Sequence, residues 1–178
     1  GSLAFDGDLR FEAEDLARVR ASYPGGPQGV FLKRVGDGSG EPRLVYAKAL
    51  VYPAAAAPLV RLLGMDRGLL VLNALAFAAA LWLGFVELRR ASGAGRAAAG
   101  VLAVVAGGVV PVYLLWQTPE IFNLALVTAG LVAWRRGFPL ASAVLLGVAA
   151  YSKPTNIALA LPLLLEPLVV GGAAWPRR

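Results

Sequence analysis

Two long uncharged apolar runs constrain this chain more than any other feature. Residues 68–86 form an uncharged run of 19 residues, and residues 97–116 form one of 20 residues. A helix needs roughly 20 apolar residues to cross the hydrocarbon core of a bilayer, so both runs qualify as transmembrane helices. Three shorter apolar runs follow, at 119–134, 138–152 and 156–174. The pattern predicts a mainly α, polytopic membrane protein with about five transmembrane helices, the first covering about 68–88.

The charges are divided unevenly between two regions of the chain. Residues 1–66 carry eight Lys/Arg and eight Asp/Glu, whereas residues 67–178 carry nine Lys/Arg and only three Asp/Glu. The excess cations stand at the ends of apolar runs, so we interpret them as topology signals and expect no nucleic-acid partner. The chain has no Cys and no His, which excludes disulfides and thiol nucleophiles and removes the commonest general base.

The arginines favour one orientation in the membrane. Seven of them follow the first, third and fifth apolar runs: Arg89, Arg90, Arg96, Arg135, Arg136, Arg177 and Arg178. A five-span arrangement puts all seven on one side, which is the cytoplasmic side by the positive-inside rule. Residues 1–66 are then extracytoplasmic, on a bacterial inner membrane whose lipids surround the spans. If 138–174 were instead one kinked helix, the last two arginines would move outside.

The polar residues 1–66 are expected to form a small extracytoplasmic segment. Residues 12–21 have helical spacing, and the β-like runs 29–35 and 43–48 flank a Gly-rich turn, which favours a β-hairpin. The apolar run 50–63 contains two prolines and predicts a helix lying at the membrane interface. The only methionine is Met65, so we expect further sequence upstream of Gly1.

Four charged residues of the predicted outer loops are candidates for chemistry: Asp6, Asp8, Glu120 and Lys153. Carboxylates from separate loops can bind a divalent cation or act as a general base, and a Lys can hold a phosphate as a point charge. Each also has a structural alternative. Asp6-Gly-Asp8 is typical of a turn, Thr118-Pro-Glu120 of a capped helix start, and Lys153 of a side chain reaching the interface. Glu166 lies in an apolar run, and Asn73 in the first span is interpreted as a packing residue.

Four short stretches resemble a known family when they are taken in order. They are Ser2-Leu-Ala-Phe-Asp-Gly-Asp-Leu9, Tyr46-Ala-Lys-Ala-Leu-Val-Tyr-Pro53, Thr118-Pro-Glu-Ile-Phe122 and Gly147-Val-Ala-Ala-Tyr-Ser-Lys-Pro-Thr-Asn156. The chain resembles the N-terminal part of polyprenyl-phosphate-sugar-dependent glycosyltransferases of the GT-C fold, the group that includes protein mannosyltransferases and aminoarabinose transferases.

The resemblance implies transfer of a sugar from a polyprenyl-phosphate carrier to an acceptor at the outer membrane face. Asp6, Asp8 and Glu120 would be the acidic residues of the site, although the main base of such enzymes usually lies upstream of a segment like Asp6-Gly-Asp8. Lys153 would contact the carrier phosphate, and Tyr46 and Lys48 the substrate. Asp8 and Glu120 would be the ligands if a divalent metal ion takes part.

Two other classes of protein fit the same pattern. A lipid-carrier transporter or an assembly scaffold would share the spans and be non-enzymatic, although transporters tend to carry polar groups on broken helices at mid-membrane. A sugar polymerase or ligase of a different fold would use the same carriers through arginines of the outer loops, for which Arg10, Arg18 and Arg43 are candidates.

Overall fold

A computed structural model describes residues 2–22, 32–36, 43–161, 163 and 165. The chain divides into two compact units, residues 1–72 and 73–178, which we call the N-terminal and C-terminal units and describe separately. The predictions that concern Glu166, Arg177, Arg178 and the far part of the fifth span lie outside the described residues.

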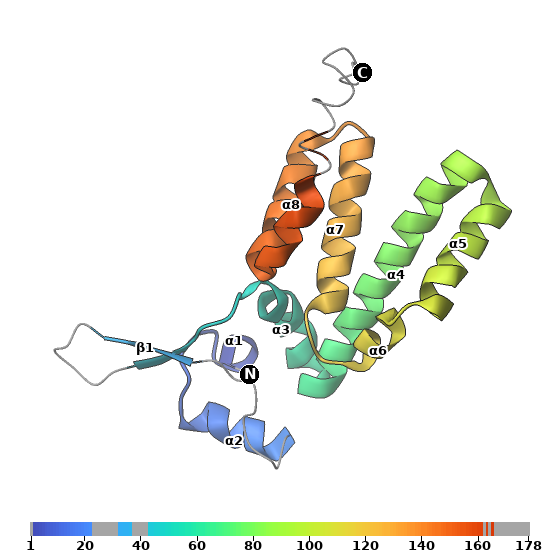
Figure 1. The fold of residues 1–178 in the computed structure, drawn as a ribbon. Coiled ribbons are helices and arrows are strands. Elements are labelled where there is room, and N and C mark those ends of the chain that lie inside the picture. Colours follow the sequence, from blue (N-terminus) through green and yellow to red (C-terminus); the bar gives the residue numbers. More distant parts are fainter. Residues whose placement is uncertain (1, 23–31, 37–42, 162, 164, 166–178) are drawn as a thin grey trace. The chain divides into compact units, whose positions relative to one another are not determined.

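The described part of the N-terminal unit combines short helices with one antiparallel pair of strands (Figure 1). Its elements are α1 (Ser2–Phe5), α2 (Ala13–Ser22), β1 (Leu32–Val35), β2 (Arg43–Tyr46) and α3 (Val51–Leu63). The two strands pair antiparallel, with Leu32 opposite Tyr46 and Val35 opposite Arg43. The predicted short helix and β-hairpin are therefore confirmed, whereas the residues between the strands lie outside the described chain. The one-turn helix α1 was not predicted.

A small apolar core joins α1, α3 and the first turns of the next helix. Ala4, Ala56 and Val60 are buried there, and Met65 and Leu69 pack against them. The chain turns from α3 into the next helix at Gly64, whose φ of 83° lies in the left-handed region that favours glycine. Helix α3 buries only one face, and Leu62 on its other face is 79% exposed.

The C-terminal unit contains most of α4 (Met65–Ser92), followed by α5 (Ala94–Gly107), α6 (Val110–Leu115), α7 (Glu120–Arg135), α8 (Pro139–Ser152) and the 3₁₀ helix η1 (Pro154–Ala160). Figure 1 shows α7 and α8 side by side as an antiparallel pair. Val127, Leu146 and Ala149 are buried between them. A Cβ added at Gly130 would lie 2.8 Å from Leu146 Cγ, so glycine lets these two helices approach closely.

The structure confirms a mainly helical chain and contains one helix that meets the length and apolarity of a membrane span. Among the described residues, only the 28-residue α4 does so, with 17% of its most apolar window buried. The helices α5, α7 and α8 have 14, 16 and 14 residues. Five spans therefore stay a prediction.

The apolar run 97–116 forms two helices instead of the single helix expected from its composition. Helix α5 ends at Gly107 and α6 begins at Val110. Two successive glycines weaken the helix, and Pro111 has no N–H to bond the Gly107 carbonyl, with which its ring would clash in a continuous helix. Hydropathy does not register either effect, because all of these residues are uncharged and compatible with a membrane.

Candidate functional site

Asp6, one of the expected acidic site residues, forms an ion pair within the N-terminal unit. Arg18 NH1 donates to Asp6 Oδ1 at 3.1 Å, and Arg18 NH2 also contacts Asp6 Oδ2. The same NH2 group lies 2.8 Å from Asp15 Oδ1. The guanidinium thus links the loop after α1 to helix α2, and the hydrogen bonds that it donates to Asp15 and then to Asp6 raise the pKa of Arg18.

Asp15 is the most buried carboxylate in this network. Its side chain is 2% exposed, and its Oδ2 accepts a hydrogen bond from the Glu12 amide at 3.2 Å, which stabilises the start of α2. Burial raises the pKa of Asp15, but the neighbouring Ser2 hydroxyl, Arg18 guanidinium and Glu12 amide lower it by more, so the pKa lies below the ordinary 3.8. Sequence reasoning missed this residue because its only signal was its position near a helix start.

Asp8, Tyr46 and Lys48, the other expected site residues of this unit, differ in their surroundings. Asp8 Oδ1 accepts from the Arg10 amide at 3.1 Å, a local turn contact. The Tyr46 hydroxyl lies 3.0 Å from Ser2 Oγ, and its ring meets Phe11 edge-on at 5.9 Å. Lys48 is exposed in the bend after β2. In this unit, Asp6 and Asp8 therefore organise the loop, as the turn interpretation expects.

Glu120 and Lys153 come together at one end of the α7–α8 pair. Lys153 Nζ lies 3.4 Å from Glu120 Oε1, and the two side chains are 47% and 31% exposed respectively. Glu120 is the first residue of α7, and Lys153 directly follows α8. Antiparallel packing of the two helices brings these positions to the same end, so two residues from separate sequence motifs form one charged pair.

The loop before Glu120 is fixed by helix α4. The Trp116 carbonyl accepts hydrogen bonds from Asn73 Nδ2 and from the Thr118 amide, both at 2.8 Å. Asn73 is fully buried, which agrees with its interpretation as a packing residue. Thr118 was expected to cap helix α7, but Pro119 occupies the N-cap position and no side chain caps the helix.

The loop that carries Lys153 is fixed by Asn156. Asn156 Nδ2 donates to the Ala149 carbonyl at 2.9 Å, and the Asn156 amide donates to the Lys153 carbonyl at 2.9 Å. The Lys153 amide itself donates to the Ala149 carbonyl at 2.9 Å. These three bonds close the turn between α8 and η1 and hold the lysine backbone in an extended conformation. Asn156 is the last residue of the stretch 147–156, but nothing in that stretch indicated that its side chain closes the turn.

Asn123, three residues after Glu120 on α7, has a buried side-chain amide. Both of its polar atoms lack a hydrogen-bond partner in the described part of the chain. Asn123 is 4% exposed and continues the stripe of Val127 and Gly130 that faces α8. Unpaired buried groups cost free energy unless water or a ligand satisfies them. Asn123 therefore offers one donor group and one acceptor to water or a ligand at this end of the α7–α8 pair.

No group of three or more carboxylates is placed to hold a metal ion in the described ranges. Asp8 and Glu120, the expected ligands, belong to different units. Metal dependence stays a prediction of the resemblance. Comparison with known families, curated proteins and solved structures found no match in any of the three. The relationship to glycosyltransferases also stays a prediction.

Proposed function

We propose that this chain is part of a membrane glycosyltransferase, which moves a sugar from a polyprenyl-phosphate carrier to an acceptor hydroxyl at the outer membrane face. The observation that carries the proposal is the Glu120–Lys153 pair, with 3.4 Å between its charged atoms. The pair joins two of the four sequence stretches on which the resemblance rests. A partly exposed cation beside a partly exposed carboxylate offers both groups that such a transfer needs.

The chemistry follows from the two side chains. The acceptor oxygen forms a bond to the anomeric carbon of the sugar while the bond from that carbon to the carrier phosphate breaks. Glu120 takes the hydroxyl proton. Lys153 stabilises the negative charge on the departing phosphate, which stays on the lipid carrier.

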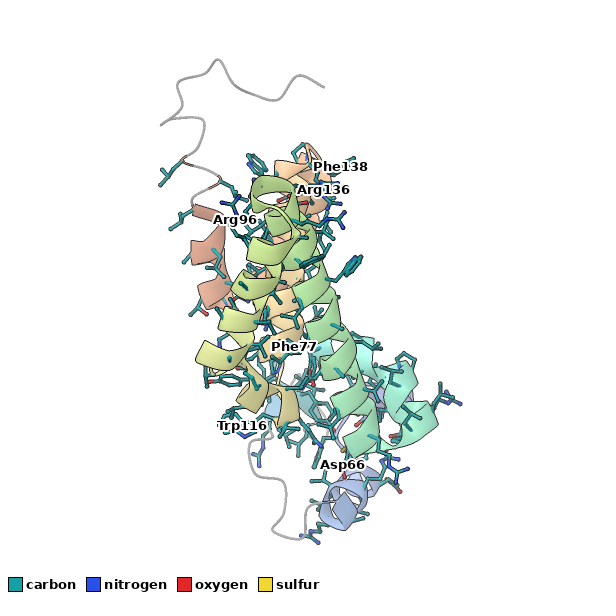
Figure 2. All side chains as sticks on the ribbon, turned by 90° about the vertical axis from the view of Figure 1, so that its right-hand side faces the viewer. Asp66, Phe77, Arg96, Trp116, Arg136 and Phe138 are labelled. Atoms are coloured by element: carbon teal, nitrogen blue, oxygen red, sulfur yellow. The ribbon has the colours of Figure 1, made fainter. Side chains whose placement is uncertain are left out.

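Membrane placement of the pair is part of the same proposal. The 19 uncharged residues of α4 rise about 28 Å at 1.5 Å each, close to the hydrocarbon thickness of a bilayer. Figure 2 shows Arg96 and Arg136 at one end of the C-terminal unit and Trp116 at the opposite end. Trp116 precedes Glu120 by four residues, so the charged pair and the arginines belong to opposite ends. We propose five spans, with the arginine end cytoplasmic.

The transfer activity is tested on the full-length protein reconstituted in vesicles with labelled polyprenyl-phosphate sugars. Release of the carrier phosphate and labelling of acceptors are measured for Glu120→Gln and Lys153→Ala, with Glu14→Gln and Lys33→Ala as exposed controls from the other unit. We expect losses of about 10²–10⁴-fold for Glu120→Gln and unchanged activity for the controls. Full activity of both site variants would refute their roles.

The orientation is tested separately in intact cells, since the chain contains no cysteine of its own. Cysteines introduced as Ala91→Cys and Thr155→Cys lie near the two ends, at exposed positions. A membrane-impermeant thiol reagent added outside should label the second site and not the first. Equal labelling of both would overturn the proposed topology.

One observation favours the transporter alternative. The run 97–116 is interrupted between α5 and α6, and the helices bury the polar side chains of Asn73 and Asn123. Transporters use broken helices and buried polar groups at their substrate sites. Movement of the lipid carrier across vesicle membranes without release of its sugar would favour transport over transfer. That movement should be lost in Asn123→Leu and kept in Glu120→Gln.

A further inference from the structure

The end of the C-terminal unit away from Glu120 carries a concentration of positive charge. The arginine cluster comprises Arg89, Arg90, Arg96, Arg135 and Arg136, from the ends of α4, α5 and α7. Figure 2 shows Arg96 and Arg136 at this end, together with Phe138. Glu87 is the only acidic residue in sequence between 67 and 119, and it lies among them. Five arginines against one glutamate give a local charge of 5 − 1 = +4.

Glu87 fixes two of the arginines and leaves others available. Its Oε1 lies 2.7 Å from Arg136 NH2 and 3.3 Å from Arg90 NH1, and the Glu87 side chain is 13% exposed. Arg96 Nε donates to the Ser92 carbonyl at 2.7 Å. Arg89 and Arg135 are exposed and have no ion pair within the described ranges. The cluster is thus held together by one carboxylate while it retains uncompensated guanidinium groups.

An open apolar groove lies on the C-terminal unit. It runs between α4 and α5 and is lined almost entirely by carbon, with Trp82 and Phe85 on one side and Val101 and Leu102 on the other. Ala78, Trp82, Phe85 and Arg89 follow the spacing i, i+4, i+7 and i+11, so they share one face of α4. Trp82 and Leu102 are 66% and 65% exposed. The α4 side of the groove therefore lies on the same helix face as Arg89, which is one turn beyond Phe85.

We infer that this groove and Arg89 bind one anionic phospholipid, with an acyl chain between α4 and α5 and the headgroup phosphate at Arg89. Charge complementarity selects the occupant: a net charge of +4 beside an apolar groove fits a lipid that carries uncompensated negative charge, and fits a zwitterionic lipid less well. Arginine suits the phosphate because its planar guanidinium donates two parallel hydrogen bonds.

The inference rests on the membrane placement of α4 and is independent of the transferase chemistry. Its test is native mass spectrometry of the full-length protein from bilayers of phosphatidylglycerol diluted into phosphatidylcholine. We expect preferential retention of phosphatidylglycerol, reduced about fivefold in Arg89→Gln and further weakened by added salt. The matched control is Arg61→Gln, an exposed arginine of α3 in the other unit.

A second variant tests the groove without removing charge. Ala98 lines the groove and is exposed, so Ala98→Phe fills the channel while leaving every arginine in place. It should reduce retention of phosphatidylglycerol although the cluster is intact. Equal retention of both lipids by the unmodified protein, or unchanged selectivity in both Arg89→Gln and Ala98→Phe, would overturn the inference. Cysteine labelling of the same preparations reports membrane insertion, so failure of the topology is distinguished from failure of lipid selectivity.

Discussion

Lys153 and Glu120 lie 33 positions apart in sequence, yet their charged atoms are 3.4 Å apart across the end of the α7–α8 pair. Neither residue is fixed by the ion pair itself. Asn73 anchors the loop before Glu120 through the Trp116 carbonyl, and Asn156 closes the turn that carries Lys153. The separation of the two charges is therefore set by helix packing and by two asparagine amides.

The first prediction concerns what the charged pair contributes to stability. Both side chains are partly exposed, at 47% and 31%, and such pairs contribute about 0–1 kcal/mol. A double-mutant cycle with Glu120→Gln and Lys153→Ala should give a coupling of that size in the free energy of unfolding, measured in detergent micelles. A coupling of several kcal/mol would indicate that the pair is a structural element, which would weaken its assignment to the site.

The second prediction concerns Asn156 as a residue that positions Lys153. Replacing Asn156 by Ala removes one of the two hydrogen bonds to the Ala149 carbonyl and should loosen the turn, because only the Lys153 amide still holds it closed at that point. We expect faster hydrogen exchange of the Lys153 and Asn156 amides. In the transfer assay, a raised KM for the lipid donor with a smaller change in kcat would fit a positioning role. Asn156→Asp, which cannot donate from its ionised side chain, should behave in the same way.

The sequence predicted the elements whose signal is local or depends on length. The uncharged run 68–86 indicated α4, the alternating runs on either side of a Gly-rich stretch indicated β1 and β2, and spacing indicated α2. It did not predict the break at Gly107 and Gly108, because hydropathy is the same for a continuous and an interrupted apolar helix. The sequence also identified Glu120 and Lys153 as candidate site residues, which the structure brings together. It contained no sign of the role of Asn123, since the burial of an amide depends on which helix covers it.

The third prediction concerns the close approach of α7 and α8 at Gly130. A Cβ there would lie 2.8 Å and 2.9 Å from Leu146 Cγ and Cδ2, so Gly130→Ala forces the helices or the leucine to move. Overpacking of this kind costs about 1–3 kcal/mol. Gly147→Ala on α8 is the control, since nothing lies within 4 Å of its added Cβ. Thermal unfolding should separate the two variants, and equal melting temperatures would contradict close packing at Gly130.

The fourth prediction concerns the packing of α3 against the start of α4. A Cβ at Gly68 would lie 2.5 Å from the Val60 nitrogen and 2.7 Å from the Leu59 carbonyl carbon, which are backbone atoms that cannot rotate away. Gly68→Ala should therefore separate α3 from α4 and expose Val60, seen as faster hydrogen exchange across Val51–Leu63. Gly84→Ala in the same helix has no atom within 4 Å and should leave exchange unchanged.

The fifth prediction concerns the pH dependence of the N-terminal unit. The pKa of Asp15 is lower in the folded protein than its ordinary 3.8, so the unfolded chain binds the proton more tightly. The stabilisation is therefore fully present above pH 3.8 and is lost as the pH falls through the folded pKa below it. Hydrogen exchange of the α2 amides, corrected for intrinsic exchange, should show falling protection in that acidic range.

The variant Asp15→Asn tests whether this carboxylate causes the decline. It should lose protection at neutral pH, by about 1–3 kcal/mol, because the charged hydrogen bond that Arg18 donates to Asp15 disappears. It should also flatten the acidic decline, whereas the exposed control Glu14→Gln keeps it. An unchanged pH profile in Asp15→Asn would assign the decline to other carboxylates of the unit.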